Sequence, residues 1–425
     1  MKMKNKSTIT KNILLLLTVF LLENSCTTPI KAPIVKDLIE RGRTDNLFYK
    51  LENRDTVKVA YLGGSITAQP GWRVYSMDWF KGNYPETEIV EIHAAIGGTG
   101  SPFGVYRVND HVLQYKPDLV FVEFAVNDAS TPPEKITPSM EGIVHQIWQQ
   151  NPETDICFIY TIKEDFIPVY QKDSLPSSII TMEKIADHYQ IPSINFGPEV
   201  LRRVTSRKVL FKGDEAAKDT IDVFSPDGVH PYPESGHKIY RDIFVKAFSQ
   251  LKAKSENTIA AHKIKDPLSN PLVNARMMSW KAVSSGSELT PINIAGHSVF
   301  DGFAKYFDSI GEGQPGDSVS FTFQGKGFGF FDVIGPGTGS LSITIDGKEQ
   351  NFSRFDKYCT YWRISYKTYE NLENGVHQVT IKVLNNPIDK KAILAQRNNT
   401  MENEDDFETI NWYLAKLMLD GELLQ

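Results

Sequence analysis

The chain has 425 residues, of which 41% are hydrophobic and 23% are charged, a composition typical of folded globular domains. This length exceeds what one hydrophobic core ordinarily supports, so it indicates two domains. The formal net charge is −6 and comes without a long basic run, which argues against a nucleic-acid partner.

The N-terminal residues have the pattern of a secretory signal. Lysines at positions 2, 4, 6 and 11 accompany the apolar run 13–22, which is too short for a bilayer core that needs about 20 apolar residues. Cys26 follows in a context that resembles the lipid-attachment cysteine of bacterial lipoproteins, although Glu23 departs from that pattern. We therefore expect a signal over residues 1–26 and export to the periplasm or cell surface, with a lipid anchor on Cys26 or simple secretion as the alternatives.

Strand-like and helix-like segments alternate between about residues 55 and 250. Several predicted strands are continuously apolar, as in a parallel sheet covered on both faces; the strands are 57–62, 88–94, 118–126, 155–162 and 192–196. The predicted helices are 72–81, 105–115, 139–150, 179–189 and 234–251. This alternation predicts an α/β domain over residues 35–255, built as a three-layer α/β/α sandwich around a parallel sheet.

The pattern changes after Leu251. Residues 256–289 are mostly polar and contain two prolines, so we expect a linker or an entry segment there. Residues 290–425 contain short strands separated by turns, which predict a jelly-roll-like β-sandwich; the strands are 318–323, 327–333, 341–345, 361–365, 378–383 and 412–419. The glycine-rich stretch 325–340 lacks the spacing and the following helix of a nucleotide-binding loop, so we attribute it to turns.

Four short motifs in the α/β part each follow a predicted strand or precede the last predicted helix. They are GGSIT at 63–67, IGGTG at 96–100, FAVND at 124–128 and SPDGVHP at 225–231. In sheets of this kind the ligand site lies outside the carboxyl ends of the strands. The motifs are therefore expected to meet at one edge of the sheet.

The residue types in these motifs suit acyl transfer. The hydroxyl of Ser65 becomes a nucleophile when an imidazole such as His230 accepts its proton, and a carboxylate such as Asp227 can orient that ring. The backbone N–H groups of Ser65 and Gly98 and the side-chain amide of Asn127 can donate to an oxyanion, each contributing on the order of 3 kcal/mol.

In this order, the four motifs resemble those of the SGNH (GDSL-like) hydrolase superfamily, and the resemblance covers about half of the chain. It implies Ser65 as nucleophile, Gly98 and Asn127 as oxyanion donors, His230 as base and Asp227 as its orienting acid. The first motif reads GGSIT where the family has Gly-Asp-Ser-Leu, and the third lacks a glycine two positions before the asparagine. Neither departure removes a catalytic atom.

The resemblance, together with the appended sandwich, implies a secreted carbohydrate O-acetylesterase that acts on acetylated poly- or oligosaccharides without a cofactor. Two other functions stay open: a lipase or lysophospholipase that uses the same residues, and a catalytically silent surface glycan-binding protein. We expect no metal, because the histidines are scattered singly and lack metal-ligand spacing.

Three further residues are assigned to the surroundings of the site. Glu123 is a charge within an apolar strand and needs a partner, so we expect a structural pair with Arg73 or Arg107. Trp72 and Arg73 follow Ser65 closely in the sequence. They are expected to line the substrate pocket or to support the site through helix packing.

Several other residues have two interpretations. His237 is an alternative base, but Glu234 is its only close carboxylate in the sequence, so we place it at the surface. Cys157 lies in an apolar strand, which favours a buried free thiol over a disulfide. Aromatic residues of the sandwich form its core or stack on sugar rings; they are Tyr358, Tyr361, Trp362, Tyr366 and Tyr369.

Overall fold

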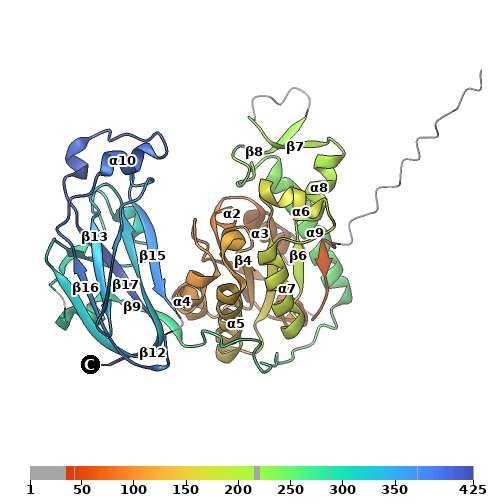
Figure 1. Cartoon of the computed structure of the whole chain (residues 1–425). Helices are drawn as coiled ribbons and strands as arrows, with labels where there is room; N and C mark the ends of the chain where they lie inside the picture. The colour runs from red at the N-terminus through yellow and green to blue at the C-terminus, as the bar shows by residue number, and fades with distance from the viewer. Residues whose placement is uncertain (1–34, 43, 215–220, 287, 371, 425) are drawn as a thin grey trace, which may run out of the picture.

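The computed structural model describes residues 35–42, 44–214, 221–286, 288–370 and 372–424. An α/β domain and a mainly β domain lie side by side (Figure 1). The expected signal over residues 1–26, including Cys26, lies outside the described residues. Across these described ranges, no helix is long and apolar enough to cross a membrane.

The α/β domain is built around a six-stranded sheet with the order β1-β6-β5-β4-β2-β3 in the described part of the chain. Strands β2 to β6 are parallel to their neighbours, and β1 is antiparallel to β6. The bounds are β1 Leu38–Ile39, β2 Thr56–Gly63, β3 Glu88–His93, β4 Leu119–Glu123, β5 Asp155–Tyr160 and β6 Ser193–Asn195. The predicted parallel sheet is confirmed, with β1 as an unpredicted edge strand.

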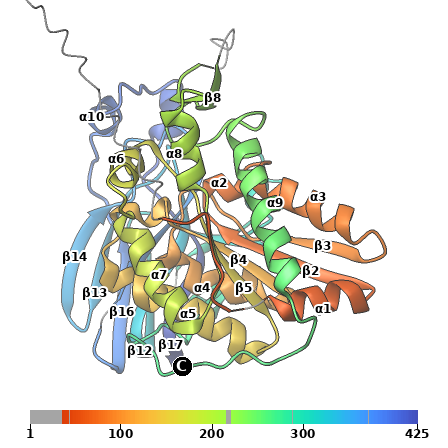
Figure 2. The same cartoon turned by 90° about the vertical axis from the view of Figure 1, so that its right-hand side faces the viewer.

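Helices cover both faces of this sheet and produce three layers (Figure 2). One face carries α4 (Ser101–His111), α5 (Pro133–Gln150) and α7 (Ser177–Tyr189). The other face carries α1 (Asp45–Asn53), α3 (Trp72–Asn83) and α9 (Gly236–Lys254). Shorter elements complete the domain: α2 Ser65–Ala68, α6 Ile167–Tyr170, α8 Gly197–Thr205, and the parallel pair β7 Val209–Lys212 and β8 Asp222–Ser225. The predicted α/β/α sandwich is confirmed.

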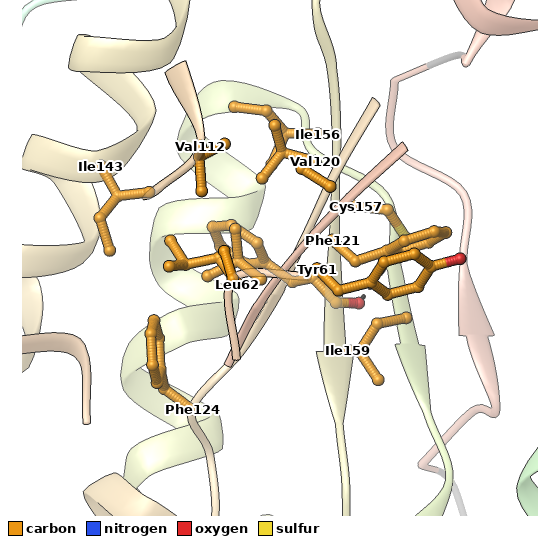
Figure 3. Close-up of a cluster of buried hydrophobic side chains, with 14 of the residues drawn as sticks. Tyr61, Leu62, Val112, Val120, Phe121, Phe124, Ile143, Ile156, Cys157 and Ile159 are labelled. Carbon is orange, nitrogen blue, oxygen red and sulfur yellow. Dashed lines mark hydrogen bonds between the residues drawn. The ribbon is translucent and has the colours of Figure 1, made fainter. Parts of the chain in front are cut away.

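Apolar side chains of neighbouring strands fill the space between sheet and helices (Figure 3). Tyr61 of β2 stacks on Phe121 of β4 with a centroid distance of 5.2 Å, and Phe121 meets Phe248 of α9 at 5.5 Å. Cys157 of β5 lies in this core as a buried free thiol, as predicted. Burial of the strands on both faces explains why their sequences are continuously apolar.

The C-terminal domain is a β-sandwich of antiparallel strands. The first half of β12 pairs with β16 and its second half pairs with β15, while β17 follows β12 along most of its length. The strands are β9 Ala275–Ser279, β10 Thr290–Asn293, β11 Ser309–Gly313, β12 Ser318–Ile334, β13 Ser340–Ile345, β14 Lys348–Ser353, β15 Arg363–Tyr369, β16 Gly375–Val383 and β17 Trp412–Leu424. A short helix, α10 (Lys390–Ala395), lies at one end of the sandwich (Figure 1).

The structure of the C-terminal domain differs in two details from the sequence prediction. The predicted strands 318–323 and 327–333 form one continuous strand, β12, so attributing residues 325–334 to turns was wrong. A Cβ atom at Gly325 would lie 2.3 Å from the carbonyl oxygen of Asp420, and one at Gly329 would lie 2.4 Å from that of Lys367. These glycines allow close approach of neighbouring strands. Within the predicted linker or entry segment 256–289, β9 pairs with β17.

Helix α4 of the α/β domain forms contacts with the sandwich. It packs against β9 and β17. Its Phe103 ring stacks on Tyr366 of β15 with centroids 4.6 Å apart and lies 4.9 Å from the ring of Phe331 on β12. One hydrophobic cluster therefore continues from the α/β core into the sandwich.

Candidate active site

The two glycines before Ser65 allow the end of β2 to pack directly on the end of β4. A Cβ atom at Gly64 would lie 1.9 Å from Oδ1 of Asn127, and one at Gly63 would lie 2.9 Å from the carbonyl oxygen of Glu123. The chain then turns at once into α2, of which Ser65 is the first residue. The glycines thus place the serine at the carboxyl edge of the sheet, beside Asn127.

Ser65, His230 and Asp227 form a continuous hydrogen-bonded chain. Oγ of Ser65 lies 2.8 Å from Nε2 of His230, and Nδ1 of His230 lies 2.7 Å from Oδ2 of Asp227. An ionised carboxylate only accepts hydrogen bonds, so Nδ1 must carry a proton, and Nε2 of the neutral ring accepts from the serine hydroxyl. This geometry suits transfer of the serine proton to His230.

The loop that carries His230 also fixes the carboxylate of Asp227. Oδ1 of Asp227 accepts hydrogen bonds from the backbone amides of Val229 and His230 at 2.9 and 2.8 Å. Partial burial opposes ionisation, but the hydrogen bonds from the His230 ring and these two amides hold the pKa of Asp227 well below its usual range. The carboxylate is therefore ionised where it faces the imidazole.

The segments that carry the other two predicted oxyanion donors, Gly98 and Asn127, lie beside Ser65. A Cβ atom at Gly97 would lie 3.6 Å from Cβ of Ser65, so the loop after β3 lies against the serine. Gly98 has a φ of +73°, and a Cβ atom there would meet open space. Asn127 begins the turn after β4 and packs on Gly64. The structure thus brings together all five residues predicted for the catalytic centre.

Asp128 anchors the loop that contains Gly98, and the sequence analysis missed it. Its two carboxylate oxygens accept from the backbone amide of Ser101 at 3.1 and 3.2 Å. A Cβ atom at Gly100 would lie 2.1 Å from its Oδ1. Burial raises the pKa of Asp128 to about 7. The only sequence signal for this role is its position directly after Asn127.

The predicted pairing of Glu123 with an arginine is wrong. Glu123 is buried and accepts from the hydroxyls of Thr67 and Thr161, both at 2.8 Å. Arg73 instead pairs with Glu91 and donates to the carbonyl oxygen of Thr67 at 3.0 Å. Two neutral hydroxyls thus take the place of the predicted arginine. The sequence did not reveal them, because they lie on segments that it does not place beside β4. Glu123 still joins the segment after Ser65 to the end of β5.

Arg107 is a second anchor of the site loops rather than a partner of Glu123. Its guanidinium donates to the carbonyl oxygens of Ala94 and Gly63 and lies 3.4 Å from the hydroxyl of Thr99. Burial lowers the pKa of Arg107 to about 9. This residue therefore links the end of β2 to the loop after β3.

Trp72 and His237 lie beneath the site. Trp72 is fully buried, and its indole N–H donates to Oγ1 of Thr67 at 3.2 Å. It therefore supports the site and does not line a substrate pocket. The placement of His237 at the surface was wrong, because it is fully buried and its Nδ1 accepts from the amide of Trp72 at 3.2 Å. Burial lowers the pKa of His237 to about 4.

The described residues contain no group of three or more His, Cys, Asp or Glu side chains that could hold a metal ion.

Comparisons with known proteins agree with this fold. Residues 61–239 match the model of the GDSL-like lipase/acylhydrolase family. Two solved structures of a two-domain esterase active on acetylated mannans, one of them co-crystallised with mannopentaose, cover 92% of this chain and 98% of their own. Their TM-scores are 0.68 and 0.70, with sequence identities of 19% and 18%.

At this identity the likeness concerns the fold, which includes both domains. A comparison with curated proteins found no match. The family match confirms the SGNH resemblance of the four motifs, and the α/β domain of this chain is a member of the GDSL-like lipase/acylhydrolase family, a family of carboxylic ester hydrolases.

Proposed function

We propose that this protein is a secreted serine esterase that removes small acyl groups, chiefly acetyl, from carbohydrate. The observation that carries the proposal is the hydrogen-bonded chain from Ser65 through His230 to Asp227. The same three residue types perform acyl transfer on several unrelated folds.

In the proposed mechanism, Oγ of Ser65 attacks the ester carbonyl while Nε2 of His230 takes its proton. The imidazolium is stabilised by the carboxylate of Asp227 and then protonates the sugar oxygen as its bond to the acyl carbon breaks, so that the sugar leaves as the alcohol. Water, deprotonated by His230, hydrolyses the acyl-serine and releases the acid. The amides of Ser65 and Gly98 and the side chain of Asn127 hold the oxyanion in both steps.

A cleft beside the oxyanion loop supports a carbohydrate substrate. Its lining includes Gly97 and Gly98 on one side and Tyr358, Tyr361 and Arg363 of the sandwich on the other. Tyr358 and Tyr361 are 40% and 57% exposed, and aromatic faces of this kind stack on sugar rings. The two-domain fold, which this chain shares with an esterase active on acetylated mannans, also supports a carbohydrate substrate.

The location of the enzyme is part of the proposal. The basic and apolar segment before Cys26 supports export, and Cys26 supplies an acceptor for a lipid. Expression of the full chain and of a Cys26→Ser variant in a bacterial host, followed by membrane fractionation, distinguishes an anchored from a released protein. A wild-type protein found only in the cytoplasm would contradict export.

The test of the activity compares wild type with Ser65→Ala and His230→Ala. We expect acetate release from 4-nitrophenyl acetate and from acetylated manno- and xylo-oligosaccharides, and loss of nearly all activity in both variants with unchanged thermal unfolding. Nitrophenyl esters of increasing chain length separate deacetylation from lipase activity. Hydrolysis that rises with acyl length, or that survives Ser65→Ala, would refute the proposal.

A further inference from the structure

Ser225, the last residue of β8, makes two hydrogen bonds within the turn that carries Asp227 and His230. Its hydroxyl accepts from the backbone amide of Gly228 at 2.9 Å and donates to Oδ1 of Asp227 at 3.1 Å. The serine is fully buried. It opens the motif SPDGVHP, but the sequence analysis gave it no role.

The Ser225 hydroxyl joins the carboxylate of Asp227 to the strand that precedes the turn. The other hydrogen bonds to Oδ1 come from the amides of Val229 and His230, which belong to the turn itself and hold the carboxylate relative to that turn. Ser225 instead belongs to β8 and lies opposite Lys212 of β7. Its hydroxyl therefore holds the carboxylate relative to the strands from which the turn projects.

Packing contributes little to the position of this carboxylate. The side chain of Asp227 is 51% exposed, so contacts with other side chains cannot by themselves fix its rotamer. Its Oδ2 holds Nδ1 of His230 at 2.7 Å, and the orientation of that ring decides whether Nε2 faces Ser65. A displacement of Asp227 would therefore change the contact that removes the serine proton.

We propose that Ser225 is a positioning residue of the catalytic centre, which holds the carboxylate of Asp227 where it orients His230. The inference rests on the proposed function, in which these two residues activate Ser65. A hydroxyl has one donor and two acceptor sites. The amide of Gly228 uses one acceptor site and leaves the O–H free to point at the carboxylate. Supporting hydrogen bonds of this kind keep a site in its productive geometry.

Ser235 provides a matched control for the loss of a buried hydroxyl. It is 5% exposed, and its hydroxyl donates to the carbonyl oxygen of Val223 in the same strand, β8. Ser225→Ala and Ser235→Ala each remove a hydrogen-bonded hydroxyl next to β8, so both should lower the temperature of thermal unfolding by a few degrees. Only Ser225→Ala should affect catalysis, because only Ser225 holds the carboxylate of Asp227.

The first measurement is kcat and KM for 4-nitrophenyl acetate in wild type and the two variants. We expect Ser225→Ala to lower kcat about tenfold, the effect of one hydrogen bond to a charged group, with KM unchanged. Ser235→Ala should keep the kcat of wild type. Equal kcat in Ser225→Ala and wild type, equal losses in the two variants, or a change confined to KM would overturn the inference.

The second measurement is the proton NMR signal of the Nδ1 proton between His230 and Asp227. Its far-downfield resonance is assigned by its loss in Asp227→Asn. We expect the resonance to shift or broaden in Ser225→Ala and to stay unchanged in Ser235→Ala. An unchanged resonance in Ser225→Ala would overturn the inference.

The two measurements separate this inference from the proposed function. The NMR signal needs no substrate, so it tests the support of Asp227 by Ser225 whatever ester the enzyme hydrolyses. Failure to deacetylate glycans would count against the proposed substrate alone. Absence of any Ser65-dependent hydrolysis of 4-nitrophenyl acetate in wild type would refute the proposed function, and with it the catalytic consequence of the Ser225 contact.

Discussion

The reactivity proposed for Ser65 depends on a histidine 165 positions later in the chain. The spacing of three residues between Asp227 and His230 allows their side chains to meet within one turn, and the backbone amides of that turn hold the carboxylate ionised. This local part of the triad was predictable from the sequence. The contact with Ser65 depends on the sheet.

The first prediction concerns Asp227. Asp227→Asn retains an oxygen for the amides of Val229 and His230 but cannot stabilise the imidazolium as an anion does. We expect kcat for 4-nitrophenyl acetate to fall on the order of ten-thousandfold with little change in stability. Asp346→Asn removes a similar carboxylate from His377 in the sandwich and serves as the control. Comparable activity in the two variants would contradict the role of Asp227.

A second prediction concerns the buried His237, whose pKa falls from 6.5 to about 4. Between about pH 4 and pH 6.5 the unfolded chain binds a proton at this residue and the folded chain does not. The free energy of unfolding should therefore decrease as the pH falls from about 6.5 to about 4, by up to about 3 kcal/mol. Urea unfolding of wild type and His237→Gln across this range is the measurement. An equal pH dependence in both proteins would contradict the assignment.

At the scale of elements, the connection from β2 to α2 depends on the absence of side chains at its glycines. Residue 64 has an extended backbone that any residue can adopt. A larger residue is excluded there by the lack of room for a side chain, and not by the backbone conformation. The Asn127 amide occupies the position that a Cβ atom would take. The sequence motif indicates a sharp turn, but the reason for the glycine lies on another strand.

The third prediction follows from this contact. Gly64→Ala should displace Asn127 and lower kcat on the order of a hundredfold, the effect of losing an oxyanion donor. The fold should remain, because the backbone conformation is unstrained. Gly82→Ala, where a Cβ atom meets nothing within 4 Å, is the control. Full activity of Gly64→Ala would contradict the role of Asn127.

Strands buried on both faces were predictable because they are continuously apolar, whereas β12 was not predicted in full. Its glycines resemble turn residues when only the local sequence is considered. In the structure, neighbouring strands lie so close to Gly325 and Gly329 that a side chain would clash. A local pattern cannot distinguish a glycine needed for close packing from a glycine needed for a turn.

At the scale of the whole molecule, one hydrophobic cluster spans both domains. Phe103 belongs to this cluster and contacts Phe331 and Tyr366 of the sandwich. The two domains should therefore unfold together.

The fourth prediction tests this coupling. Differential scanning calorimetry of wild type should show one transition, and Phe103→Ala should reduce the free energy of unfolding by about 3–5 kcal/mol and separate the domains into two transitions. Phe352→Ala, at a partly buried residue that packs against the sandwich cluster, should lower stability without separating them. Two transitions in the wild type would contradict the coupling.

The sequence by itself determined the alternation of strands and helices in the α/β domain, the class of both domains and the residues of the candidate triad. These properties depend on local periodicity and on short motifs. Only the tertiary structure decided the partners of Glu123 and Arg107, the burial of Trp72 and His237, and the stacking of Tyr366 on Phe103. Each joins segments far apart in the chain, and one sequence contains no local signal for such contacts.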